Sequence, residues 1–318
     1  MMKIKRFQMK GRIWLLYTIL AAFSWGIWGV LTKFISIDTS PFVTHLMFTT
    51  GALFTLPFVL RRCKIKEVSI KGISLGIGAS ILVLLGNVAV YQSFKMGGQA
   101  AVVIPFTNLY PLVTILIALF IFKEKLNRIN WAGILIIIPA IIFLSGQSQI
   151  FSDPEHFFQK VELKSWLLFA FLALLLFGIF SASQKVVTNY LSTGWSYLSF
   201  VVSSVLVSVF FIASGLVDFN FSPKTFWVGS MAGFLDGFGV LAIYSAYRAR
   251  GKASKVSSIG STMQQVFTIL LALVFLHERI DLTIFTGIVL AILGAYLLLW
   301  EQKIAKSENG TNIKDSSL

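Results

Sequence analysis

The sequence has few charged residues and a single cysteine, and both shortages limit what the protein is. Only 13% of its 318 residues are Asp, Glu, Lys or Arg, whereas 56% are hydrophobic. A soluble domain needs more polar surface than this composition supplies. With Cys63 alone, the chain has no intramolecular disulfide framework and no site built from several cysteines.

Sequence patterns of common enzymes are also missing. No HExxH, GxSxG or GxxxxGK[ST] pattern occurs, and the three histidines are scattered. The fragment RGKAS at 250–254 resembles the end of a phosphate loop but lacks the earlier glycine and the preceding strand. We therefore expect no enzyme activity, no ATP hydrolysis, no cofactor and no metal site.

Long apolar runs dominate what is present. A helix needs roughly 20 apolar residues to cross a hydrocarbon core about 30 Å thick. The first run and the basic residues before it also resemble a secretory signal, but it continues without a cleavage-like site to residue 32. We predict an all-α membrane protein with ten transmembrane helices, at about 14–36, 42–60, 72–94, 99–122, 129–148, 165–187, 195–217, 225–247, 255–276 and 282–300.

The basic residues are distributed unevenly between the connections. Of the 27 Lys and Arg residues, 20 fall in the two terminal segments and the connections on their side, and five fall in the other connections. This bias predicts that both termini are cytoplasmic. No organelle-directing signal is evident, which favours a plasma membrane. The net charge of +14 suits anionic membrane lipids as partners rather than nucleic acid.

An internal repeat organises the chain. WLLYTILAAFSWGIWGVLTK at 14–33 aligns without a gap with WLLFAFLALLLFGIFSASQK at 166–185, an offset of 152. Aromatic residues keep their places within this match, Trp25 against Phe177 and Trp28 against Phe180. Further matches at offsets of 153 and 154 pair Gly76, Gly86, Ala89 and Tyr91 with Gly229, Gly239, Ala242 and Tyr244, and Glu124 with Glu278.

Five helices in each repeat give the two halves opposite orientations, because five is odd. The halves should be related by a pseudo-two-fold axis in the membrane plane. We predict a first repeat at 1–148, an outward linker at 149–164, a second repeat at 165–304 and a disordered cytoplasmic tail at 305–318. The Asp153-Pro154 turn signal supports the linker.

About 285 residues resemble the drug/metabolite transporter superfamily, specifically its ten-helix proteins with two EamA-type repeats. The resemblance is carried by Trp25-Gly26 with Lys33 and by the segments 89–144 and 242–298. Each segment has a tyrosine-bearing helix end, a short loop, a helix, and a glutamate followed nine residues later by glycine. One departure is that Pro111 has glutamine at its counterpart near residue 264.

The resemblance implies a secondary active transporter of a small polar organic metabolite, such as an amino acid or amine, with alternating access around a central cavity. Helices 1–4 and 6–9 would form this cavity, and helices 5 and 10 would be peripheral. The alternatives are a flippase for a lipid-linked sugar or other amphiphile, and a passive channel. A homodimer is compatible with the sequence.

Asp236 is the acid that lies inside a predicted helix, where a charge costs on the order of 3 kcal/mol or more. It is our main candidate for proton coupling or for holding a substrate amine, and packing against a neighbouring helix is the alternative. Pro111 falls in the middle of the fourth predicted helix and should leave a carbonyl near residue 107 free. The other candidates for the cavity are Trp25, Trp28, Asn87, Asn108, Tyr110, Gln264 and Gln265.

Lys33 and Lys185 occupy matching places in oppositely oriented helices, so they should lie at opposite sides of the membrane. Snorkelling to the interface explains either residue. The alternative is that the two lysines act as coupling or gating groups at the alternate mouths of the central path. Glu124 and Glu278 also form a repeat pair, and for them we favour a structural boundary or an ion pair between helices.

Overall fold

The computed structural model describes residues 13–60, 63, 69–121, 127–144, 165–249, 251 and 253–298. Within this part of the chain every regular element is a helix, as predicted. The helices are α2 (Ile13–Ser36), α3 (Pro41–Leu53), α4 (Leu56–Leu60), α5 (Ile70–Lys95), α6 (Ala100–Thr107), α7 (Pro111–Ile121), α8 (Arg128–Leu144), α10 (Ser165–Tyr190), α11 (Thr193–Ala213), α12 (Pro223–Arg248), α13 (Ala253–Phe275) and α14 (Leu282–Leu298).

Six helical stretches are long and apolar enough to cross a membrane. Five are the single helices α2, α5, α10, α11 and α12, and the sixth is the α6–α7 stretch from Ala100 to Ile117. Shorter apolar stretches lie in α8, α13 and α14. The chain is therefore a multi-pass membrane protein, whereas the total of ten crossings stays a prediction. Residues 145–164 and 299–318, which contain the predicted linker and tail, lie outside the described residues.

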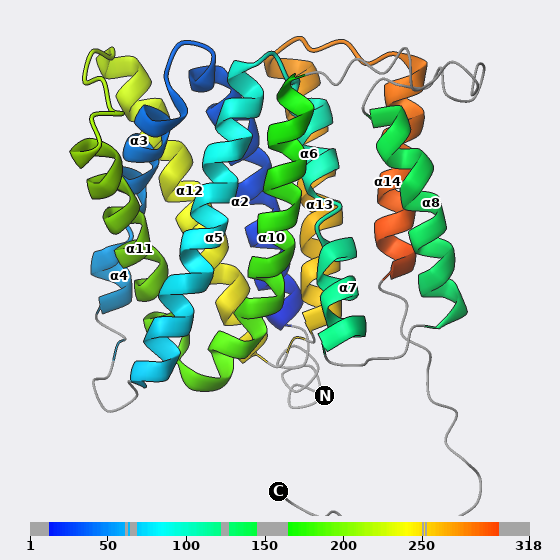
Figure 1. Ribbon diagram of the computed structural model, residues 1–318, viewed down its shortest axis with the longest axis horizontal. Coiled ribbons are helices and arrows are strands. Elements are labelled where there is room, and N and C mark those ends of the chain that lie inside the picture. Colours follow the sequence, from blue (N-terminus) through cyan, green and yellow to red (C-terminus); the bar gives the residue numbers. More distant parts are fainter. Residues whose placement is uncertain are drawn as a thin grey trace, which may run out of the picture.

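The two halves of the chain run in opposite directions through the bundle. In Figure 1, α2 and α5 run from the lower to the upper edge, whereas α10 and α12 run from the upper to the lower edge. We call the end at which α2 begins the near end and the opposite end the far end. This arrangement is the inverted topology that five helices per repeat require.

The halves also interlock. Helix α2 packs most extensively on α12 and α13 of the second half, and α10 packs in the same way on α5 and on the α6–α7 stretch of the first half. Helices α8 and α14 pack mainly on each other and form one edge of the molecule (Figure 1). Exchanging the two halves therefore exchanges equivalent pairs of helices, as a pseudo-two-fold axis demands.

Individual hydrogen bonds repeat this symmetry. The Thr268 hydroxyl donates to the Gly26 carbonyl over 3.3 Å, and the Thr114 hydroxyl donates to the Gly178 carbonyl over 3.0 Å. Each bond joins a helix of one half to the first helix of the other half. Both threonines and both glycines are repeat partners, so the duplication is preserved in contacts as well as in sequence.

Two repeat-related glycines allow aromatic rings to approach the opposite half closely. A Cβ atom on Gly239 would lie 2.5 Å from Nε1 of Trp25, and a Cβ atom on Gly86 would lie 2.6 Å from the ring of Phe177. Trp25 and Phe177 are themselves repeat partners. The glycines therefore let an aromatic ring from each half lie directly on a helix of the other half.

Two predicted helices are broken, which corrects the sequence-based assignment. The second predicted helix divides into α3 and α4 at Phe54 and Thr55, because the ring nitrogen of Pro57 cannot donate to the Leu53 carbonyl. The fourth divides into α6 and α7. Pro111 begins α7, where its missing N–H costs nothing, instead of kinking the middle of a helix.

The break at Pro111 gives the Thr107 carbonyl a partner, whereas we expected a free carbonyl near this residue. The Tyr110 N–H donates to the Thr107 carbonyl over 3.0 Å, and the Thr114 N–H donates to the Tyr110 carbonyl over 3.1 Å. Residues 108–110 form a turn between α6 and α7. Two residues of this turn, Asn108 and Tyr110, line the cavity described below.

Candidate functional site

A cavity lies inside the bundle between α2, α5, α10, α12, α13 and the α6–α7 turn. The space open to the centres of water-sized spheres is about 60 Å³. One water needs roughly 10–15 Å³ of such space, so the cavity has room for about four to six waters. Its lining residues are Trp25, Trp28, Val83, Asn87, Asn108, Tyr110, Phe177, Phe180, Ser181, Gln184, Asp236, Val240 and Gln264.

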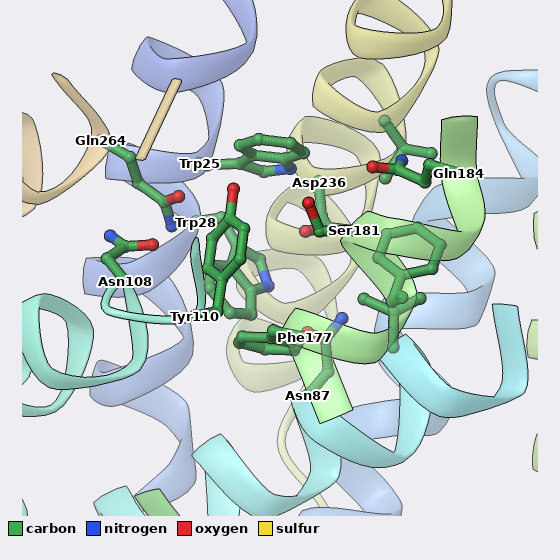
Figure 2. Close-up of a pocket in the computed structure, with 13 residues that line it drawn as sticks. Trp25, Trp28, Asn87, Asn108, Tyr110, Phe177, Ser181, Gln184, Asp236 and Gln264 are labelled. Carbon is green, nitrogen blue, oxygen red and sulfur yellow. The ribbon is translucent and has the colours of Figure 1, made fainter. Parts of the chain in front are cut away.

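Asp236 supplies the charge of this cavity. Figure 2 shows its side chain on α12 pointing into the space among the aromatic rings. The residue is only 5% exposed, and no hydrogen bond or ion pair joins its carboxylate to the described residues. No lysine, arginine or histidine is among the thirteen lining residues. A buried carboxylate is costly unless it is protonated or paired with a cation.

Hydrogen-bond donors without partners surround the same space. They are Nδ2 of Asn87 and Nδ2 of Asn108, both buried; the buried Nε1 of Trp28 and Nε2 of Gln184 lie near the hydroxyl groups of Tyr91 and Tyr244, without a well-aligned hydrogen bond. An indole N–H only donates, whereas the assignment of amide N and O atoms follows from the hydrogen-bond network. Unpartnered buried donors cost about 1–3 kcal/mol each, so a solute with oxygen acceptors would be stabilised in this cavity.

Aromatic rings form much of the wall, as Figure 2 shows for Trp25, Trp28, Tyr110 and Phe177. The rings of Tyr110 and Phe177 meet edge to face, with centroids 6.5 Å apart and planes at 87°. Phe180 completes the aromatic part of the lining. The faces of such rings attract ammonium and guanidinium groups, most strongly where water is excluded.

Seven of the predicted cavity residues come together in this site: Trp25, Trp28, Asn87, Asn108, Tyr110, Asp236 and Gln264. Two predicted residues lie outside the lining. Gln265 is fully buried, and neither polar atom of its amide has a partner. Pro111 begins α7 next to the lining turn and shapes the cavity only through Tyr110.

Our sequence reasoning did not assign Val83, Phe177, Phe180, Ser181, Gln184 and Val240 to the cavity, although all six line it. Four of them could have been predicted, because their repeat partners were already assigned to the cavity. Phe177 and Phe180 are the partners of Trp25 and Trp28 at the offset of 152. Val83 and Val240 are the partners of Asp236 and Asn87 at the offset of 153.

The cavity is therefore symmetric in position and asymmetric in chemistry. Asp236 from one half stands opposite Val83 from the other, and Asn87 is matched by Val240. The two halves supply equivalent backbone places, while the polar groups differ from half to half. A solute bound here therefore meets two chemically different walls.

Lys33 lies at the far end of α2 rather than in the cavity. Its Nζ atom donates to the carbonyl oxygens of Gly98 over 2.7 Å and Phe94 over 3.2 Å. These carbonyl groups belong to the end of α5 and to the connection between α5 and α6. Simple snorkelling is therefore an incomplete description, because the ammonium group ties α2 to this connection. The Lys185 side chain lies outside the described residues.

Glu278 binds the same connection from the opposite side. Its two carboxylate oxygens accept hydrogen bonds from the backbone N–H groups of Ala100 and Ala101, over 2.7 Å and 2.8 Å, and so cap the start of α6. It also interacts electrostatically with Lys33. Glu278 is thus a structural group at a boundary, as favoured, and its main partners are backbone N–H groups. Its repeat partner Glu124 lies outside the described residues.

Among the described residues, no group of three or more His, Cys, Asp or Glu side chains lies close enough together to hold a metal ion. The cavity itself offers one carboxylate together with amide and hydroxyl groups. The lining thus combines hydrogen-bonding groups, aromatic faces and one carboxylate.

Comparison with known proteins identifies the family. The model of the EamA-like transporter family matches residues 12–146 and again residues 164–300. This chain belongs to the EamA-like transporter family. The double match confirms the resemblance to the drug/metabolite transporter superfamily and the two-repeat architecture. The exact boundaries at 148 and 165 stay predictions.

Individual relatives of this EamA-like chain carry general names. A protein of Clostridium kluyveri named an uncharacterized transporter is 24% identical over 266 residues, which cover 80% of this chain and 82% of that protein. An uncharacterized transporter of Archaeoglobus fulgidus is 26% identical over 140 residues, covering 43% of this chain and 48% of that protein. An uncharacterized protein of Methanocaldococcus jannaschii is 25% identical over 127 residues, which are 40% of this chain and 92% of that protein.

A solved structure shares the fold of this EamA-like chain. It is a crystal structure that superposes with a TM-score of 0.60 at 18% sequence identity. The match covers 88% of this chain and 95% of the solved chain. At this identity the likeness concerns the fold alone.

Proposed function

We propose that this protein is a secondary active transporter that carries a small polar organic solute with a cationic group, such as an amino acid or an amine. The observation that supports this most is Asp236, a buried carboxylate without a protein partner among the described residues, in a cavity lined by aromatic rings and amide donors. The family membership gives the coarser function, movement of a solute across a membrane.

The cavity chemistry favours a solute with two kinds of group. An ammonium group would bind Asp236 and the aromatic faces. Carboxylate or hydroxyl oxygens of the solute would accept hydrogen bonds from the donors of Trp28, Asn87, Asn108 and Gln184. Because Asp236 is the one charged residue of the lining, the cavity becomes electrically neutral once such a cationic group, or a proton, is bound.

Alternating access would move this site between the two membrane sides, driven by a gradient or by exchange. The interlocked inverted halves support a rocking motion around the central cavity. With the near end in the cytoplasm, as the basic residues favour, the far end with Lys33 and Glu278 is external. The protein would act in the plasma membrane.

Uptake by proteoliposomes tests the proposal. Labelled amines and amino acids should accumulate in a saturable manner and show counterflow, whereas neutral sugars should not. Redistribution of a lipid-linked sugar without solute uptake would instead establish a flippase, and unsaturable flux without counterflow would establish a channel.

Two variants test the role of Asp236 directly. Asp236→Asn should lower uptake of a cationic solute by about 10- to 100-fold, the factor expected for losing a hydrogen bond to a charged group. The paired change Asp236→Val with Val83→Asp moves the carboxylate to the equivalent place in the other half and should restore part of the uptake. If Asp236→Asn left both the rate and its pH dependence unchanged, the assigned role would be wrong.

A further inference from the structure

A second and larger cavity lies on the other side of α12 from Asp236. Its volume is about 610 Å³, compared with about 60 Å³ for the central cavity. We call it the lateral groove. It is lined by Tyr17, Leu20, Thr55, Val59, Ser192, Thr193, Gly194, Phe234, Phe238, Leu241, Ala242, Ser245 and Arg248.

The groove lies where the two halves differ at one helix. In the second half, α11 continues unbroken to Ala213, whereas its counterpart α3 ends at Leu53. The chain then turns through Phe54 and Thr55 into the short α4. Thr55 and Val59 of this broken segment form one wall of the groove, and α12 forms the other.

The upper part of the groove is apolar and open to the surroundings of the bundle. Phe234, Phe238 and Leu241 follow one another along one face of α12. Leu20 and Phe238 are 37% and 39% exposed. In a membrane-spanning bundle such side chains face lipid, so the groove is accessible to acyl chains from the bilayer.

The lower part of the groove is polar and lies at the near end. Tyr17 is in the first turns of α2, Ser192 is in the turn between α10 and α11, and Arg248 is the last residue of α12. The start of α2, the end of α10 and the end of α12 all lie at the lower edge in Figure 1. The Arg248 guanidinium has no hydrogen bond or ion pair within the described part of the chain, and no acid lines the groove.

Ser192 adds a second group without a partner. It precedes α11 as Ser40 precedes α3, and the two are repeat partners. The Ser40 hydroxyl accepts a hydrogen bond from the Val43 N–H, whereas the buried Ser192 hydroxyl has no partner. The polar end of the groove thus presents a cation and a free hydroxyl at the start of a helix, a combination that favours a bound anion.

We propose that the lateral groove binds one anionic phospholipid of the leaflet at the near end, with its phosphate at Arg248 and Ser192 and an acyl chain along α12. The dimensions agree. Fourteen residues of helix separate Phe234 from Arg248, which corresponds to about 21 Å. Half of a hydrocarbon core is about 15 Å thick, so one acyl chain and its phosphate fit this length.

The near end is also where an anionic lipid is expected. Most basic residues of the chain belong to segments on this side, and the cytoplasmic leaflet carries the anionic lipids. A neutral lipid would fill the apolar part equally well but would leave Arg248 without a counter-charge. This inference concerns a site separate from the central cavity and does not depend on the identity of the transported solute.

Native mass spectrometry of the full-length protein, released from bilayers of equal parts phosphatidylglycerol and phosphatidylethanolamine with identical acyl chains, tests the proposal. The protein should retain one phosphatidylglycerol in preference to phosphatidylethanolamine. Arg248→Gln should reduce this preference about fivefold, the factor that corresponds to about 1 kcal/mol per basic side chain near the membrane surface. Lys95→Gln is the matched control, because Lys95 is the exposed repeat partner of Arg248 at the far end.

A filling variant separates the groove from general surface charge. Ser245→Trp keeps Arg248 but occupies the space between α12 and the broken segment, so the retained lipid should be lost. Thermal stability measured on the same samples identifies a misfolded variant, and Ala242→Phe then replaces it. Equal retention of both lipids by the unmodified protein, or undiminished preference after Arg248→Gln, would overturn the proposal.

Discussion

Glu278 and Lys33 both bind the connection between α5 and α6, and we call these hydrogen bonds the clamp. Their strength should determine how readily the far end opens. Glu278 holds the first two N–H groups of α6, and Lys33 holds the Gly98 carbonyl just before them. If opening separates α6 from the segment between α13 and α14, these bonds break. Weakening the clamp should therefore increase the population of the open state.

The substitution Glu278→Gln gives this prediction a magnitude. Hydrogen bonds to charged groups contribute about 1.5–3 kcal/mol each, and an anion at a helix start about 0.3–1 kcal/mol. Glu278 is partly exposed, which reduces these values. Glutamine keeps one acceptor, so we expect a loss of about 1.5–2 kcal/mol, which corresponds to a 10- to 30-fold larger open population.

Cysteine labelling measures this population. Val103 is fully buried behind the connection, so in a Cys63→Ser background a Val103→Cys thiol should react with a water-soluble maleimide only when the far end opens. Glu278→Gln should accelerate labelling by the same 10- to 30-fold factor. Asp281→Asn is the matched control, since Asp281 caps α14 through the Ile284 N–H and does not bind α6. Equal labelling with and without Glu278→Gln, or equal acceleration by Asp281→Asn, would refute the reasoning.

Three further predictions concern other parts of the molecule. Lys33→Gln and Lys185→Gln should impair opposite phases of transport, seen as separate losses of one-way uptake and efflux. Gly233→Ala should lower the free energy of unfolding by about 2 kcal/mol or more, because the Cβ atom of the alanine would overlap the α3 backbone. Gly78→Ala, with open space around it, should instead stabilise by about 0.5–1 kcal/mol. Asn87→Val should weaken solute binding about tenfold by removing one donor.

Each of these has an outcome that would contradict it. Equal and trivial effects of both lysine variants would return the two residues to simple snorkelling. Similar melting temperatures for the two glycine variants would contradict the close approach of α3 and α12. Unchanged half-saturation after the asparagine variant would show that its amide does not touch the solute.

Much of the architecture was predictable because transmembrane helices carry strong local signals. The apolar runs gave the helix positions, and the repeat gave the inverted arrangement that Figure 1 shows. The breaks at Thr55 and Tyr110 were missed because hydropathy does not register a missing backbone donor. Pro57 and Pro111 marked these places in the sequence. A proline can either kink a helix or begin a new one, so its presence alone did not show which of the two occurs.

The site was partly predictable for a different reason. Polar residues inside apolar runs, such as Asp236 and Asn87, are conspicuous, and the structure places both in the cavity. Phe177 and Val83 are apolar like most of their neighbours, so only their repeat partners distinguish them. The contact of Glu278 with the start of α6 joins residues 178 positions apart, which no local pattern reveals.

The packing of α2 against the second half has a consequence for biogenesis. Its principal partner α12 begins at Pro223, roughly 200 residues later, so at about 5–20 residues per second translation leaves α2 without this neighbour for about 10–40 s. During that interval three of its buried hydroxyls are already satisfied, because Thr18, Ser24 and Thr32 donate to carbonyl groups three or four residues earlier in the same helix. Helix α2 can therefore remain in the lipid bilayer as an independent unit until α12 has been synthesised. The transport site forms only after that, because it needs both helices.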